Sequence, residues 1–144
     1  MQLPWYITAL GAAVVWGIHY PLVDHALKRM SLTGVLLLTA LPILILPFVT
    51  RSVGADVAVL RAMDWSERLP ILALALSSLA GSVLLYLSIS GKNATLASLI
   101  EITYPVFVAL FAFLLFRQMH LNASVLVGAG LVFAGVAVII LGNQ

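Results

Sequence analysis

The sequence predicts an all-helical membrane protein with five transmembrane helices, and three observations support this prediction. Of its 144 residues, 63% are hydrophobic and only 8% are charged, too few polar residues to cover a water-facing surface. The acidic and basic residues lie between apolar runs of about 20 residues, the length that a helix needs to cross a bilayer. The runs are continuous rather than alternating, which favours helices over barrel strands.

Five apolar runs can be read along the chain, and each is too short to cross the membrane twice. They cover residues 3–23, 32–50, 69–91, 94–116 and 121–142. We expect a single transmembrane domain over residues 1–144, with its termini on opposite sides of the membrane because the number of crossings is odd. The first run has no preceding basic residue and contains Trp5, Trp16 and Tyr20, so we expect it to be retained rather than cleaved as a signal peptide.

The first run carries aromatic side chains and a proline near its end. Trp16 and Tyr20 are four residues apart and share a helix face, where they could contact an organic or cationic solute. Aromatic residues also anchor helices at the membrane interface, and Tyr20 fits that alternative well. His19 could be a protonatable site or a satisfied polar residue near the end of the span. Pro21 has no N–H to donate to the carbonyl of Gly17, so a bend in the helix is predicted there.

The second and third runs carry fewer candidates for function. Pro42 and Pro47 predict a bent second helix, whose side chains we expect to offer no chemistry. In the third run, Ser78 and Ser82 are four residues apart beside Gly81. They form a small polar face for close packing or for a cavity wall, and we favour packing.

The link between these two runs, residues 51–70, is the longest in the chain. Its apolar residues recur at every third position with Arg61 between them, which fits a short interfacial helix. The alternative is a solvated loop in which Asp64 or Ser66 caps the third helix.

Glu101 stands in the middle of the fourth run, roughly 6 Å from its midpoint at about 1.5 Å per residue. An ionisable group at this depth indicates function, because burying its charge costs on the order of 3 kcal/mol on insertion scales. The carboxyl could exchange a proton or a cation for a substrate. Alternatively, a neutral Glu101 is hydrogen-bonded to a neighbouring helix and is purely structural.

A proline follows Glu101 by four residues. Pro105 has no N–H, so it cannot donate the helical hydrogen bond to the carbonyl of Glu101. A bend is therefore predicted here as well. Tyr104 lies three residues after Glu101, on the same face of a continuous helix, and could donate a hydrogen bond to it. The bend could expose backbone to a central site, as in transporters, or it could only shape the bundle.

The fifth run contains three glycines seven residues apart, Gly128, Gly135 and Gly142. This interval places them on nearly one stripe, where the missing side chains let another helix approach closely. We assign the stripe to helix packing, either across a dimer or within one chain.

The basic residues divide almost equally between the two sides of the membrane. Cytoplasmic loops normally carry a clear excess of Lys and Arg. Because the two sides here carry nearly equal numbers, the charges favour neither orientation in the membrane. We expect the chain to insert both ways, unless a neighbouring protein or unequal weighting of loop charges fixes one orientation. One side receives Arg51, Arg61, Arg68 and Arg117, and the other receives Lys28, Arg29 and Lys92.

Several classes of function are disfavoured. The chain has no cysteine, so it has no disulfide and no thiolate metal site. We find no phosphate loop, no metal-spaced His/Asp/Glu cluster and no nucleophile motif, so we expect no enzyme, no metal and no cofactor. No basic cluster accompanies the net charge of +2, so we expect no nucleic-acid partner.

Two segments resemble a known family. "VVWGIHYPLVDHALKRMS", residues 14–31, resembles the opening of an EamA domain, the repeat of the drug/metabolite transporter superfamily, with its Trp-Gly pair and following proline. Residues 84–142 are similar to the family's usual close: a Tyr-bearing third helix, a short turn, a helix with a central proline, a polar turn and a Gly-rich last helix. The resemblance covers nearly the whole chain.

The resemblance implies a transporter built from repeats. Family members usually carry two such repeats, whereas this chain resembles one. Gly128 and Gly135 also resemble the dimer-forming glycine heptad of the small multidrug resistance proteins. Those relatives use a glutamate in their first helix, so its role does not transfer to Glu101 by position. Two further departures are Arg117-Gln118, where EamA domains often have Gly-Glu, and the apolar "LLLTALP", which replaces a frequent arginine.

From these observations we expect a transporter subunit that moves small organic metabolites or drugs across a bacterial inner membrane by alternating access. Its partners would be the solute, the lipid bilayer, and an inverted copy of itself or a paired homologue. Glu101 would be the proton or cation site. The alternatives are a flippase subunit for lipid-linked sugars, favoured by an aromatic groove open to lipid, and a non-transporting accessory subunit that binds a larger membrane protein through the Gly128 stripe.

Overall fold

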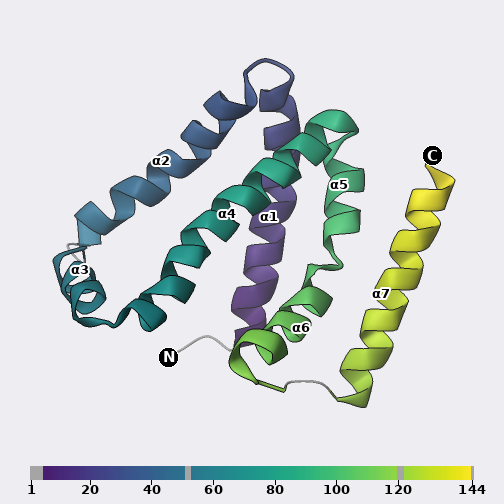
Figure 1. The fold of residues 1–144 in the computed structure, drawn as a ribbon. Coiled ribbons are helices and arrows are strands. Elements are labelled where there is room, and N and C mark those ends of the chain that lie inside the picture. Colours follow the sequence, from purple (N-terminus) through teal and green to yellow (C-terminus); the bar gives the residue numbers. More distant parts are fainter. Residues whose placement is uncertain (1–4, 51–52, 120–121, 144) are drawn as a thin grey trace. The chain divides into compact units, whose positions relative to one another are not determined.

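The computed structural model describes residues 5–50, 53–119 and 122–143, and within them it contains helices and no strand. By its internal contacts the chain divides into two compact units, residues 1–91 and residues 92–144. Figure 1 shows the helices in chain order: α1 (Trp5–Leu27), α2 (Leu32–Thr50), α3 (Val53–Ala62), α4 (Trp65–Gly91), α5 (Ala94–Glu101), α6 (Tyr104–Phe116) and α7 (Ala123–Gly142).

The predicted all-α membrane fold is confirmed. In the described part of the chain, five helical segments are long and apolar enough to cross a membrane, with α5 and α6 together forming the fourth. They are Ile7–Leu27, Leu32–Val49, Trp65–Gly91, Ala94–Phe116 and Ala123–Gly142. Three residues named in the sequence analysis lie outside the described residues. They are Leu3 and Leu121, at which we expected the first and fifth spans to begin, and Arg51, one of the basic residues assigned to a side of the membrane.

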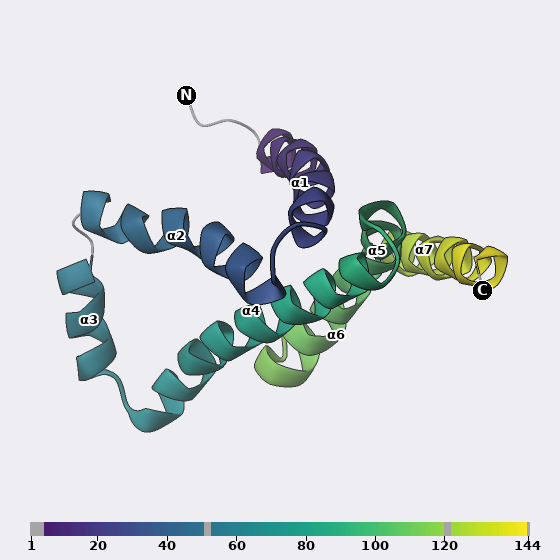
Figure 2. The ribbon, with the colours of Figure 1, turned by 90° about the horizontal axis from the view of Figure 1, so that it is seen from above.

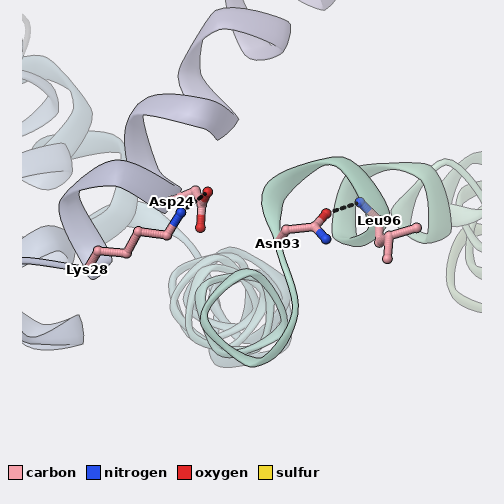
Figure 3. Close-up of polar contacts among 4 residues, drawn as sticks. All are labelled: Asp24, Lys28, Asn93 and Leu96. Carbon is pink, nitrogen blue, oxygen red and sulfur yellow. Dashed lines mark hydrogen bonds and ion pairs between the residues drawn. The ribbon is translucent and has the colours of Figure 1, made fainter. Parts of the chain in front are cut away.

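The first unit is built from α1, α2 and α4, which pack against one another. Its buried side chains are Val23 of α1, Val35 of α2, and Tyr86 and Ile89 of α4. Helix α1 extends to Leu27, four residues beyond the predicted end. An ion pair of 2.9 Å between Lys28 Nζ and Asp24 Oδ2 spans this additional turn (Figure 3).

Helix α3 occupies the long link and joins the end of α2 to the start of α4, as Figure 2 shows. A helix therefore forms where a helix and a loop were the alternatives, and none of its residues is buried. Helix α4 begins at Trp65, four residues before the predicted start, because Glu67 caps it there. The backbone N–H of Asp64 donates to Glu67 Oε2 at 3.0 Å, one half of a capping box.

The second unit contains α5, α6 and α7, with α5 packed against α7. Asn93 precedes α5 and caps it, and its side chain accepts a hydrogen bond of 2.8 Å from the N–H of Leu96 (Figure 3). Asn122 caps α7 in the same way through the N–H of Val125, at 2.9 Å. These asparagines satisfy N–H groups that a helix leaves without partners in its first turn.

Helix α6 ends at a residue in an uncommon backbone conformation. Arg117 has a φ of 56°, in the left-handed region that favours glycine. Its N–H donates to the carbonyl of Phe113 at 2.9 Å, and the N–H of Gln118 donates to that of Ala112 at 3.2 Å. The guanidinium also lies 5.7 Å from the centre of the Phe113 ring. Arg117 thus takes a place in a helix-ending motif that is usually held by glycine.

Candidate functional site

The fourth span is interrupted beside Glu101. Helix α5 ends at Glu101 and α6 begins at Tyr104, with Ile102 and Thr103 in the turn between them (Figure 1). Pro105 is the second residue of α6, a position where the N–H has no helical partner and its loss costs nothing. The proline is therefore accommodated by starting a new helix rather than by bending a continuous one.

Local hydrogen bonds hold this turn. The hydroxyl of Thr103 donates to the carbonyl of Ile100 at 3.0 Å, and the N–H of Val106 donates to the carbonyl of Thr103 at 3.0 Å. The N–H of Ile102 closes the last turn of α5 on the carbonyl of Ser98, at 3.1 Å. The span is thus divided into two half-helices, about 4 Å from its midpoint at 1.5 Å per residue.

The break changes the geometry that we expected for Glu101 and Tyr104. Glu101 is half-buried at the end of α5, and Tyr104, at the start of α6, is 60% exposed. Because the helix is interrupted between them, their spacing of three residues does not place them on one helical face. Glu101 instead stands at the C-terminal end of a half-helix, where backbone carbonyls carry partial negative charge.

Helix α1 is not interrupted at its proline, Pro21, as the fourth span is at Pro105. It remains helical from Trp5 to Leu27 through Pro21, so the two prolines that we paired in the sequence have different local outcomes. Only at Pro105 does a new helix begin.

The aromatic residues of α1 lie together in the first unit. The ring centroids of Trp16 and His19 are 5.0 Å apart, with the rings perpendicular, and those of Trp16 and Tyr20 are 6.0 Å apart. His19 and Tyr20 are half-buried, whereas Trp16 is exposed. The spacing of four residues thus correctly placed Trp16 and Tyr20 side by side, and His19 lies beside both rings.

Sequence reasoning missed Tyr86, which contacts His19, and Thr39, which contacts Tyr86. The hydroxyl of Tyr86, on α4, donates to Thr39 Oγ1 on α2 at 3.2 Å and lies 3.5 Å from His19 Nε2 on α1. Tyr86 is only 4% exposed. We call His19, Thr39 and Tyr86 the polar cluster. Our expectation that the second span offers no side-chain chemistry was wrong, because Thr39 belongs to this cluster.

The glycine stripe of α7 leaves open space beside it. A Cβ added at Gly128, Gly135 or Gly142 would meet no other atom within 4 Å. Gly135 and Gly142 are exposed and Gly128 is half-buried. Gly128 also lines an aliphatic cavity of about 410 Å³ in the second unit, together with Ile102 of the turn and residues of α6 and α7, among them Pro105. Close helix approach at the stripe is thus not made within the described residues of this unit.

Within the described ranges, no group of three His, Asp or Glu side chains is placed to hold a metal ion. What the fold provides instead is a broken transmembrane helix beside a carboxyl, and a polar and aromatic cluster among three other spans. The five apolar helices are those of a multi-pass membrane protein, and broken helices near the middle of the membrane are a feature of many transporters.

The comparison with protein families agrees with this class. The model of the EamA-like transporter family matches residues 3–141, and the chain therefore belongs to that family. The resemblance drawn from the sequence is confirmed. No curated protein and no solved structure matches the chain.

Proposed function

We propose that the chain is a secondary-active transporter subunit, which moves small organic metabolites or drugs across a bacterial inner membrane by alternating access. It acts as an inverted dimer, with Glu101 as the proton or cation site. The observation that carries this proposal is the break between α5 and α6 near the middle of the fourth span.

A broken helix near the midplane suits transport because it presents backbone ends to a solute within the membrane. Here the C-terminal end of α5 carries Glu101, and the N-terminal end of α6 carries Tyr104. A carboxyl beside a helix C-terminus combines two sources of negative charge, which favours a proton or an organic cation as the bound species.

The proposed dimer fits an architecture that many transporters share. Transporters of inverted-repeat architecture place their substrate site between two units of opposite topology, and the five spans described here could form one such unit. The nearly even charge split supports insertion in both orientations. The exposed Gly135 and Gly142 offer a face on which a second α7 could pack closely.

Water access to the break tests the proposal without knowledge of the substrate. The chain contains no cysteine, so a single Thr103→Cys change introduces one thiol at the break. A Val108→Cys variant is the matched control, because Val108 lies at a similar depth in α6 and is 58% exposed. A membrane-impermeant methanethiosulfonate reagent is applied to membranes that contain either variant.

If the break faces a solute pathway, the Thr103→Cys thiol will react while the Val108→Cys thiol stays protected in lipid. Equal protection of both thiols would show that no aqueous pathway reaches the break, and it would count against transport through this site.

A further inference from the structure

The polar cluster contains a chain of hydrogen bonds whose direction can be deduced. The hydroxyl of Thr39 donates to the backbone carbonyl of Leu36 at 3.0 Å, and a carbonyl oxygen can only accept. The single hydroxyl proton of Thr39 is therefore used, so Thr39 Oγ1 must accept in its contact with Tyr86. The proton of the Tyr86 hydroxyl is in turn used in that bond.

This direction determines the role of His19. Since Tyr86 has no second proton, its oxygen must accept in the 3.5 Å contact with His19 Nε2, and Nε2 must carry a hydrogen. A neutral imidazole has one N–H and one acceptor nitrogen. In the neutral imidazole the acceptor is therefore Nδ1, and of the two neutral tautomers only this one satisfies all three contacts at once. The carbonyl of Leu36 thus selects the tautomer of a histidine on another helix.

We propose that Tyr86 and Thr39 position His19 so that its Nδ1 accepts a hydrogen bond from the transported solute. This proposal rests on the transport function proposed above, and it names the solute class: organic cations that carry an N–H donor. Tyr86 and Thr39 act through His19 and are positioning residues.

The surroundings of His19 favour such a cation. Trp16 and Tyr20 lie beside the imidazole, with ring centroids 5.0 and 6.4 Å from it, and aromatic faces attract cations. An ammonium group could thus contact the aromatic faces while it donates to Nδ1. A quaternary ammonium would meet the same faces but would have no hydrogen to donate.

The tautomer can be measured directly by nitrogen NMR on protein labelled with ¹⁵N-histidine, at about pH 8.5, where a free imidazole is neutral. The His19 signals are assigned by their loss in a His19→Gln variant. We expect the wild-type protein to carry the hydrogen on Nε2. A Thr39→Val change removes the acceptor of Tyr86, whose hydroxyl can then donate to Nε2, and the imidazole hydrogen should move to Nδ1.

The conservative Thr39→Ser variant is the control, because it keeps the hydroxyl and should keep the hydrogen on Nε2. A wild-type hydrogen on Nδ1, or a Thr39→Val spectrum with the wild-type tautomer, would overturn the deduced chain. A purely structural cluster would lose stability in Thr39→Val without this change of tautomer.

Two probes then test the solute class on the same labelled protein. Benzylammonium and benzyltrimethylammonium share a ring and a charge, but only the first has N–H donors. We expect wild-type protein to bind benzylammonium about tenfold more tightly, as followed by the His19 Nδ1 shift, and Thr39→Val to lose that preference. Equal affinity in the wild-type protein would refute the solute class, whatever the outcome of the thiol experiment at the break.

Discussion

The polar cluster predicts a measurable loss of stability when its central hydroxyl is removed. Tyr86→Phe keeps the buried ring and deletes one oxygen, which contacts both Thr39 and His19. Interhelical hydrogen bonds in membrane proteins contribute about 0.6 kcal/mol each on average. Two such contacts give an expected loss of about 1 kcal/mol in the free energy of unfolding. The side chain is only 4% exposed, so water cannot readily replace the lost bonds.

The assay is reversible unfolding of the purified protein in mixed micelles, followed by circular dichroism. Tyr104→Phe is the matched control, because Tyr104 is 60% exposed and its hydroxyl should be worth less than about 0.5 kcal/mol. A double-mutant cycle with Thr39→Val isolates the Tyr86–Thr39 bond, and the two changes should be non-additive. Additive losses, or a Tyr86→Phe protein as stable as Tyr104→Phe, would refute the hydrogen-bond chain.

Four further predictions concern the break, the turn after α6 and the topology. Glu101→Gln should abolish proton-driven ethidium flux in proteoliposomes while leaving insertion intact, and undiminished flux would remove Glu101 from the mechanism. Pro105→Ala restores an N–H at the second position of α6, so α5 and α6 should join and the Thr103→Cys thiol should react more slowly; an unchanged rate would show that the proline does not maintain the break. Arg117→Gly should be more stable than Arg117→Val by at least about 1 kcal/mol in the same unfolding assay, because a β-branched residue is strained at a φ of 56°, and equal stabilities would contradict that strain. Cysteines placed at either terminus should label from both sides of intact cells, whereas labelling from one side would exclude the inverted homodimer.

The membrane fold was predictable because each transmembrane helix can be recognised from the local sequence alone. Each span satisfies its own backbone hydrogen bonds, so a continuous apolar run is sufficient to recognise it. The ends of the spans were less accurate, since they depend on local pairs such as Asp24–Lys28 and on the capping of α4 by Glu67. These interactions add or remove a turn without changing the hydropathy of the run.

The candidate site was predictable only within single helices. Spacing correctly grouped Trp16 and Tyr20 on one face of α1, because they lie in one continuous helix. It could not show that Tyr86 contacts both His19 and Thr39, since periodicity within a span does not reveal how three helices are rotated toward one another. The available signals were a threonine and a tyrosine inside apolar runs, Thr39 and Tyr86. The threonine is a weak signal, because Thr commonly bonds to its own helix, as Thr39 also does to Leu36.

The turn beside Glu101 also has a consequence for biogenesis. Helix α5 has 8 residues and α6 has 13, about 12 and 20 Å of helix, whereas the hydrocarbon core is about 30 Å thick. Neither piece can cross alone, so the insertion machinery must receive Ala94–Phe116 as one hydrophobic segment and release it as a whole. The segment is apolar enough for this, with a mean hydropathy of 2.2. The two half-helices thus enter the lipid together, as one span whose turn is held by its own local hydrogen bonds.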